Sequence, residues 1–505
     1  MRPAFEGFAG IPQEVRLLFK GLSSLSNLEI EGLLQTSHRT LAKGIKRNKI
    51  FKTEDNIGRK INRYSRVVIS LTESPYSGNF FKNIVEFTEK KFISFLLLIS
   101  IFFNIGKIRI TKFESNFFKD FIWRSLFSKT LSANDFELVS DKNHRICSIP
   151  WHNMHMAGLL TMNIFNVPRY PKLDTEDFEI FIGQTPYPGR VNSNTKLVIR
   201  YHDAIPIFMP HTIPNKSIHQ ATHFYALANN VKNNSWFACV SESTRQELLK
   251  VYPELEKRSV TIHNMISNAY FNENADKNLI PEIIRSRLHE GDGAKGIDLN
   301  VKFLTLREKE NFYKSNLDSI EYLLMVSTIE PRKNHSRLLA AWEVIRQKYH
   351  PNLKLIIVGG LGWNYESLMP TFKNWIDRGQ LFMLSSVPSP ELRRLYKNAA
   401  ATVCPSLGEG FDFSGVEAMR SGGVTVASDI PVHREVYQDA AEYFNPYSTM
   451  SLVESLKQVL FDKNSDQVRQ ILVSKGEQVS AQYLPETILP QWDAFLNKLM
   501  NSKKA

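Results

Sequence analysis

Short apolar runs alternate regularly with amphipathic helical patterns in the C-terminal half of this 505-residue chain. The runs "YLLMVST", "LKLIIVGG", "QLFMLSSV", "ATVCPS" and "VTVAS" are typical of strands, and patterns such as "HSRLLAAWEVIRQKY" and "SPELRRLYKNA" between them are typical of helices. Such alternation predicts parallel strands joined by crossover helices, that is, a doubly wound sheet. The predicted fold class is therefore α/β.

The N-terminal half shows a weaker version of the same pattern. Strands are predicted at 27–34, 66–71, 178–183, 196–203 and 236–241. We therefore divide the chain into an N-terminal domain at 1–275, with a basic and apolar insertion at about 40–150, a charged connection at 276–318, and a C-terminal domain at 319–485. A final helix at 486–505 is expected to pack back on the N-terminal domain. Two such domains place a cleft at the carboxyl ends of their strands.

Composition narrows the classes of partner. The hydrophobic fraction of 43% is ordinary for a globular protein, and the net charge of +12 indicates an anionic partner such as a phosphate-rich ligand or an acidic membrane surface. The basic residues do not form a recognisable nucleic-acid-binding module, so no nucleic acid is expected. Three scattered cysteines and a first segment without an apolar core predict a cytoplasmic protein.

Two stretches of the N-terminal half bear on membrane contact. The segment 90–109 holds mostly apolar residues between basic flanks and is too short to span a bilayer. It is read either as a buried core helix or as a segment that contacts a membrane peripherally at the inner face of the cytoplasmic membrane. The lysine-rich segment 43–66 is read as a solvated loop.

Cationic side chains follow the first strand of the C-terminal domain in "TIEPRKNH". Arg332 and Lys333 project from the carboxyl end of that strand. A guanidinium and an ammonium side by side can neutralise a diphosphate and stabilise charge that grows on a leaving phosphate. A solvated surface pair is the alternative from the local sequence alone.

The stretch "SLGEGFDFSGVEAM" places Glu409 and Glu417 on either side of a bend that leads into a helix. Carboxylates accept hydrogen bonds from sugar hydroxyls, so Glu417 could hold a ribose diol and Glu409 the hydroxyls of a transferred sugar. The alternative for Glu417 is a capping box with Ser414. The helix N-terminus offers backbone N–H groups to phosphate oxygens; these belong to Gly410, Phe411, Asp412 and Ser414.

Two further candidate positions lie in the N-terminal half. His202 ends a predicted strand in "YHDAIP", where it could contact a sugar or assist proton movement, or serve as an ordinary loop histidine. Gly7 and Gly10 precede an amphipathic helix, and glycine allows a ligand to approach the backbone closely.

Together, "STIEPRKN" and "PSLGEGFDFSGVEAMRSGG" resemble the retaining glycosyltransferases of family 4, which have the GT-B fold and include many bacterial mannosyltransferases. The resemblance implies two Rossmann-like domains that face each other across a cleft. It assigns the donor diphosphate to Arg332 and Lys333, the donor sugar to Glu409 and the nucleotide ribose to Glu417. His202 matches the histidine near the donor sugar, and Gly7 and Gly10 match the glycine-rich first loop.

The chain departs from the family pattern at two positions of the bend. Asp412 stands where many relatives have glycine, and Ser414 where they have proline. An aspartate beside a diphosphate is expected to turn away from it.

The resemblance implies a hexosyltransferase that moves a hexose, mannose favoured, from a nucleotide diphosphate sugar such as GDP-mannose to an acceptor hydroxyl with retention. The acceptor would be an oligosaccharide or a lipid-linked glycan in bacterial polysaccharide or lipopolysaccharide O-antigen assembly. No Asp-x-Asp motif stands at a strand end, so no metal and no cofactor are expected.

Other classes stay open. The first is a catalytically inactive nucleotide-sugar-binding subunit of a glycan assembly complex. The second, a nicotinamide-dependent oxidoreductase, depends only on the incomplete glycine pattern "VGGLG".

Overall fold

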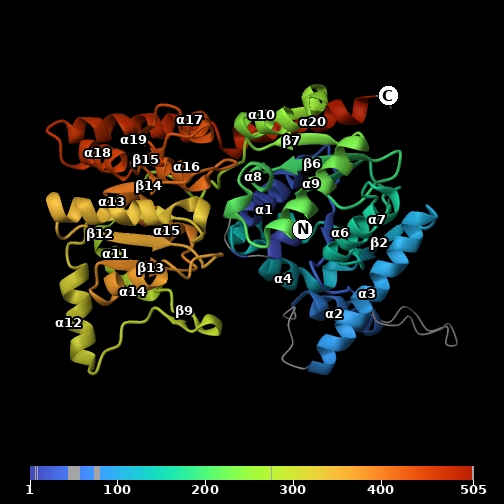
Figure 1. The fold of residues 1–505 in the computed structure, drawn as a ribbon, viewed down its shortest axis with the longest axis horizontal. Coiled ribbons are helices and arrows are strands. Elements are labelled where there is room, and N and C mark those ends of the chain that lie inside the picture. Colours follow the sequence, from blue (N-terminus) through green and yellow to red (C-terminus); the bar gives the residue numbers. More distant parts are fainter. Residues whose placement is uncertain are drawn as a thin grey trace.

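The protein, seen in a computed structural model, consists of two α/β domains that lie side by side (Figure 1). The structure describes residues 1–5, 7, 10–41, 43, 57–72, 80–274 and 276–502. The predicted α/β class is confirmed, and the arrangement is that of the GT-B fold.

The C-terminal domain is built on a six-stranded parallel sheet with the order β13-β12-β11-β14-β15-β16. Five of its strands confirm the predicted runs, and the edge strand β16 was not predicted. The six strands are β11 (Tyr322–Val326), β12 (Lys354–Val358), β13 (Leu381–Leu384), β14 (Ala401–Cys404), β15 (Thr425–Ser428) and β16 (Ala441–Phe444). The strand order reverses between β11 and β14, and ligands of such sheets bind at the carboxyl ends of the strands beside this switch point.

Helices cover both faces of this sheet, because its strands are apolar on both sides. Leu323 and Met325 of β11 point into one cluster with Trp342, whereas Tyr322 and Leu324 point into another with Tyr396. The helices are α13 (His335–Lys348), α14 (Met369–Asp377), α15 (Ser389–Asn398), α16 (Phe413–Arg420), α17 (Pro431–Tyr437), α18 (Thr449–Leu460) and α19 (Ser465–Ala481).

The N-terminal domain has two four-stranded sheets, with the orders β1-β3-β2-β4 and β5-β6-β7-β8. The second is entirely parallel, whereas β2 runs antiparallel to β3. The edge strands β1 and β5 line a common cavity of about 200 Å³ under α1. The strands are β1 (Gly32–Leu34), β2 (Ile108–Phe113), β3 (His144–Cys147), β4 (Leu173–Asp174), β5 (Ile180–Gly183), β6 (Lys196–Tyr201), β7 (Trp236–Cys239) and β8 (Ser259–Thr261).

The helices of this domain surround both sheets (Figure 1). They include α1 (Gly10–Ser23), α2 (Ile57–Thr72), α3 (Phe80–Phe102), α4 (Lys119–Ile122), α5 (Phe136–Ser140), α6 (Trp151–Leu160), α7 (Met162–Phe165), α8 (Ile205–Phe208), α9 (Lys216–Lys232) and α10 (Glu242–Val251).

Several predictions for the N-terminal half are wrong in detail. The strand predicted at 66–71 belongs to α2, because Tyr64, Val67, Val68 and Leu71 follow helical spacing and pack together in one cluster. For the same reason residues 57–66 are helical rather than a loop; the rest of the predicted loop, apart from residue 43, lies outside the described residues. Only the last three residues of 27–34 form a strand.

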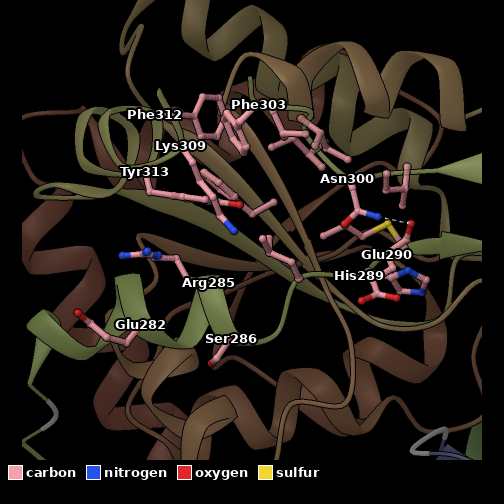
Figure 2. Close-up of a pocket in the computed structure, with 17 residues that line it drawn as sticks. Glu282, Arg285, Ser286, His289, Glu290, Asn300, Phe303, Lys309, Phe312 and Tyr313 are labelled. Carbon is pink, nitrogen blue, oxygen red and sulfur yellow. Dashed lines mark hydrogen bonds between the residues drawn. The ribbon is translucent and has the colours of Figure 1, made fainter. Parts of the chain in front are cut away.

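The stretch 276–318 folds onto the C-terminal domain. It contains α11 (Ile280–Ser286), β9 (Gly291–Asp292), β10 (Ile297–Asp298) and α12 (Leu306–Leu317). The His289 N–H donates to the Met383 carbonyl of β13, at 2.8 Å. Figure 2 shows the cavity of about 590 Å³ between this stretch and the sheet, with Phe303 and Phe312 on one side and Arg285 on another. None of the predicted site residues lines it.

The last helix, α20 (Pro485–Asn501), lies on the N-terminal domain. Its Trp492 and Leu496 are buried against Leu18 of α1 and Val198 of β6. The chain therefore crosses between the domains twice, once before α11 and once after α19.

Candidate active site

A cavity of about 680 Å³ lies between the two domains, beside the switch point of the C-terminal sheet. The loops after β11 and β14 form one wall, and the loop after β6 together with the start of α1 forms the other. All ten residues predicted from the sequence line it: Gly7, Gly10, His202, Arg332, Lys333, Glu409, Gly410, Phe411, Ser414 and Glu417.

Arg332 and Lys333 converge on Glu409. The Arg332 Nη1 donates to Glu409 Oε2 at 2.7 Å and to the Gly408 carbonyl at 3.1 Å. The Lys333 Nζ lies 2.6 Å from Glu409 Oε1, and the Arg332 Nε lies 2.6 Å from Glu330 Oε1. The two cations of the predicted diphosphate site are thus held side by side by carboxylates, and they do not point into bulk solvent.

Burial and charge act in opposite directions on this cluster. Burial alone lowers the pKa of Arg332 and of Lys333, but Glu409 and the neighbouring carboxylates outweigh it and raise both pKa values. Burial alone raises the pKa of Glu409, and the two cations outweigh it so that the pKa falls. All three groups are therefore charged at neutral pH. Arg332 and Lys333 can bind an anion when their contacts with Glu409 loosen.

Glu417 lies at the other end of the cavity and is almost fully buried. Its Oε1 accepts a hydrogen bond from Gln13 Nε2 of α1 at 2.6 Å, and its Oε2 accepts one from the Tyr396 hydroxyl at 3.3 Å. Burial raises the pKa of Glu417 to about 7, against the opposing effect of these hydrogen bonds. The contact with Gln13 joins the two domains across the cavity.

The capping-box alternative for Glu417 is wrong. The N-cap of α16 is Asp412, whose side chain accepts from the Ser414 N–H at 3.2 Å and from the Ser414 hydroxyl at 2.6 Å. Ser414 is thus inside the helix, and the Glu417 carboxylate does not return to the helix end. Its position in the cavity has no role in capping.

Asp412 lines the cavity, and its carboxylate is held at the start of α16. Its backbone has φ +63°, a left-handed conformation that favours glycine. Its Oδ2 lies 3.3 Å from Nε2 of the buried His433. Burial alone raises the pKa of Asp412, but Lys333 and the His433 and Ser414 contacts outweigh it and hold the pKa well below its usual range. The aspartate is therefore an anchored helix cap.

Gly410 allows the domains to meet closely. A Cβ at this position would stand 1.8 Å from the His202 carbonyl oxygen, so no other residue fits without movement of the backbone. Phe411 is buried between the domains against Tyr483, with ring centroids 5.2 Å apart. Phe411 can therefore offer only its backbone to a ligand, because its side chain packs in the interface.

The glycines of the first loop differ from each other. Gly10 begins α1, and a Cβ there would lie 3.4 Å from the ring of Phe413. Gly7 is exposed, and its carbonyl accepts a hydrogen bond from Arg16 at 2.9 Å. Both line the cavity, but only at Gly10 would an added Cβ meet the opposite domain.

His202 stands between the carboxyl end of β6 and the cavity. Burial and the nearby Arg200 lower its pKa to about 3, so its ring is neutral at pH 7. Its Nε2 has no hydrogen-bond partner among the described residues. A neutral imidazole with a free nitrogen can exchange a hydrogen bond with a sugar hydroxyl.

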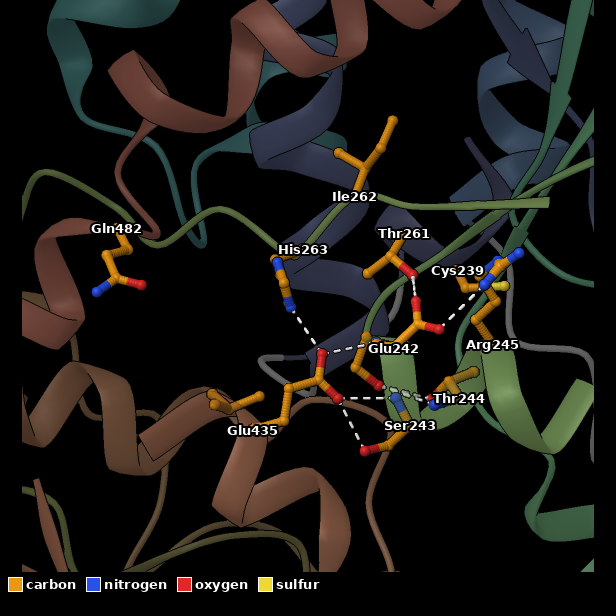
Figure 3. A network of polar contacts seen from close by, with 12 residues as sticks. Cys239, Glu242, Ser243, Thr244, Arg245, Thr261, Ile262, His263, Glu435 and Gln482 are labelled. Carbon is orange, nitrogen blue, oxygen red and sulfur yellow. Dashed lines mark hydrogen bonds and ion pairs between the residues drawn. The ribbon is translucent and has the colours of Figure 1, made fainter. Parts of the chain in front are cut away.

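A second polar network holds the domains together away from the cavity (Figure 3). Glu435 of α17 accepts hydrogen bonds from the backbone N–H groups of Glu242 and Ser243 at the start of α10, at 2.6 and 2.7 Å. His263 Nε2 lies 2.8 Å from the same carboxylate. Burial alone raises the pKa of Glu435, but these contacts outweigh it and lower the pKa. Glu435 therefore links the two domains as an anion at a helix N-terminus.

Sequence reasoning missed several residues of the site. Glu330 precedes Arg332 by two positions in the quoted motif and could have been suspected from it. Asp203 follows His202; its burial raises its pKa against the nearby Arg332. The partnership of Gln13 with Glu417 has no local signal. Within the described part of the chain, no three acidic, histidine or cysteine side chains gather closely enough to hold a metal ion.

Comparison with known proteins identifies a known domain on the C-terminal side of the cavity. Residues 307–478 match the family model described as glycosyl transferases group 1, and this segment contains Arg332, Lys333, Glu409 and Glu417. The chain therefore carries a group 1 glycosyl transferase domain in its C-terminal half.

Two curated relatives are similar to parts of this chain. The serotype-specific mannosyltransferase WbdA of Escherichia coli is 32% identical over 145 residues, which are 28% of this chain and 18% of the relative. The O-antigen chain mannosyltransferase RfbU of Salmonella typhimurium is 28% identical over 268 residues, 53% of this chain and 65% of the relative. The matches thus span less than two thirds of either relative.

The structural match extends over both domains. A sucrose-phosphate synthase from Thermosynechococcus elongatus superimposes with a TM-score of 0.50 at 13% identity, covering 71% of this chain and 84% of that chain. At this identity the match establishes the fold alone.

Proposed function

We propose that the protein is a retaining hexosyltransferase that moves a hexose, mannose favoured, from a nucleotide diphosphate sugar to an acceptor hydroxyl. The observation that carries this proposal is the pair Arg332 and Lys333 at the switch point of the sheet, facing the N-terminus of α16 across Glu409. The matched group 1 domain and the mannosyltransferase relatives support the reaction class and the sugar.

Each group has a defined task in this proposal. Arg332 and Lys333 neutralise the diphosphate as the bond between C1 of the sugar and the phosphate oxygen breaks. The start of α16 adds the partial positive charge of its backbone N–H groups. Glu417 holds the nucleotide ribose, and Glu409 and His202 contact the hydroxyls of the transferred sugar. No cofactor or metal is assigned a role, because the two cations supply the positive charge.

The acceptor attacks from the face that the diphosphate leaves. Its oxygen forms the new bond to C1, and its proton passes to the departing phosphate oxygen, so the configuration at C1 is retained. Both oxygens of Glu409 are paired with cations, and the proposal assigns no side chain as nucleophile. The acceptor is proposed to be an oligosaccharide or lipid-linked glycan in bacterial polysaccharide or O-antigen assembly, used at the inner face of the cytoplasmic membrane.

The test uses purified full-length protein with GDP-mannose and a panel of other nucleotide sugars, in EDTA. We expect donor turnover that Arg332→Ala reduces by about 100-fold or more, since removal of one charge-stabilising donor costs that much in comparable sites. Arg307→Ala, an exposed position on α12, is the matched control. Binding of the donor without any turnover would favour the inactive subunit instead. Loss of turnover in EDTA that magnesium restores would contradict the metal-independent scheme.

A further inference from the structure

Exposed apolar side chains gather on one part of the N-terminal domain. More than half of the large hydrophobic side chains exposed in the described residues lie between positions 57 and 167. Most of them belong to α2 and α3, which lie at the outer edge of the domain, away from the C-terminal domain (Figure 1). Single exposed apolar residues are ordinary, but a contiguous patch marks an interaction surface.

The orientation of α3 is set by its inner face. Leu97 and Ile101 are buried in the domain core, and Asn153 of α6 donates to the Ser94 hydroxyl at 3.1 Å and to the Lys90 carbonyl at 2.9 Å. The outer face is therefore held outward by specific contacts. Of the segment 90–109, residues 90–102 belong to α3 and residues 108–109 begin β2, so the interpretation as a buried core helix holds only for the inner face of α3.

The outer face of α3 carries a row of exposed apolar side chains. Phe92, Phe95 and Leu96 are 61%, 56% and 47% exposed, and Phe102 and Phe103 continue the row at the helix end. These positions recur at helical spacing, so they form one stripe. We call this stripe, together with the exposed side of α2, the α2–α3 face.

The patch continues beyond α3. The ring of Phe102 lies 5.7 Å from that of Phe165 in α7, and Ile164 and Val167 beside it are exposed. The guanidinium of Arg169 stacks 3.7 Å above the ring of Phe165. An apolar strip with a basic residue at its edge is thus formed by two separate parts of the chain.

Charge selects the partner. Helix α2 carries Arg59, Lys60, Arg63 and Arg66 and has no acidic residue, and its Ile57, Ile61 and Ile69 are exposed beside them. A second copy of the chain would bring the same cations against each other and be repelled. An anionic lipid headgroup layer attracts them, and the acyl boundary beneath accepts the phenylalanines.

We propose that the α2–α3 face docks peripherally on a bilayer that contains anionic phospholipid, with the stripe from Phe92 to Phe103 entering the headgroup and acyl boundary. No helix among the described residues is both long and apolar enough to cross a membrane, so the contact is one of a surface. The inference rests on the proposed function only in that a lipid-linked acceptor would be presented at that surface.

Vesicle co-sedimentation of the full chain tests the docking without donor or acceptor. We expect binding to vesicles of phosphatidylcholine with phosphatidylglycerol, weaker binding to phosphatidylcholine alone, and release by salt. The double variant Phe95→Asp with Leu96→Asp should bind vesicles at least about tenfold more weakly, because both changes place a charge where an apolar side chain would enter the membrane. Its fold should persist, since both side chains are exposed.

A matched control comes from the C-terminal domain. Leu304 and Leu306 are 96% and 81% exposed on α12 and the turn before it, so Leu304→Asp with Leu306→Asp should leave binding unchanged. Arg59→Glu with Arg66→Glu should abolish the preference for phosphatidylglycerol. Absence of vesicle binding by the wild type, equal binding by both Asp variants, or a dimer that only the Phe95 and Leu96 changes dissociate would overturn the proposal. Binding without sugar transfer would leave the docking intact and refute only the proposed function.

Discussion

Replacement of Glu417 by glutamine should change two properties in opposite directions: the stability of the protein at high pH and its affinity for the donor. Glu417 is 4% exposed, and the hydrogen-bond partners of its carboxylate, Gln13, Tyr396 and Tyr270, are neutral. Burial raises its pKa from 4.5 to about 7. The native protein thus keeps this proton at pH values where the unfolded chain has lost it.

The sign and size of the effect follow from that difference. Native stability due to Glu417 is greatest below pH 4.5 and falls as the pH rises to about 7, where the folded group also ionises. A shift of about 2.5 pKa units corresponds to about 3 kcal/mol at 1.36 kcal/mol per unit. Glu417→Gln removes this loss. The free energy of unfolding of the variant minus that of wild type should therefore be up to about 3 kcal/mol larger at pH 8 than at pH 4.5.

Urea denaturation of both proteins at several pH values between 4.5 and 8 measures the difference. Donor affinity at pH 8 should fall about tenfold or more in the variant, because an amide is a weaker acceptor than a carboxylate for a ribose diol. Glu477→Gln, an exposed position on α19 outside the cavity, is the control for both measurements. A stability difference that does not change with pH, or one that favours the wild type increasingly above pH 7, would refute the reasoning.

Three further predictions test how the cavity is held together. Gly410→Ala should weaken donor binding about tenfold by calorimetry, because its Cβ meets the His202 carbonyl; unchanged binding would show that the domains separate freely. Glu435→Ala should open the cleft, seen as a larger radius of gyration by X-ray scattering, through loss of about 1–3 kcal/mol of contact energy. His433→Ala should free Asp412 and weaken donor binding about tenfold, and adding Asp412→Asn should restore most of it; no rescue would contradict the anchoring role.

Much of the C-terminal domain could be predicted from the sequence because its signals are local. The strand β12, "KLIIV", is buried along its whole length, and the helices on either side of it show their period within a few turns. Arg332 and Glu409 follow directly after such strands, so their arrival at one edge of the sheet follows from the topology.

Secondary structure in the N-terminal half was harder to predict, because its apolar residues fit the spacing of a strand as well as that of a helix. The run 66–71 is rich in β-branched residues and reads as a strand by composition, but Tyr64 and Val67 align it as a helix with the core. The apolar segment 90–109 has enough hydrophobic residues for two faces, and local sequence does not tell which face is covered. Contacts from α6 decide it.

By itself the sequence determined most strands and helices of the C-terminal domain, and hence where the cations and carboxylates leave its sheet, since hydrophobic period and strand ends are properties of neighbouring residues. Only the tertiary structure decided that Gln13 contacts Glu417, that His433 contacts Asp412, and that Gly410 meets His202. Gln13 and Glu417 are 404 positions apart, and such pairs come together only when the packing of two complete domains fixes their distance.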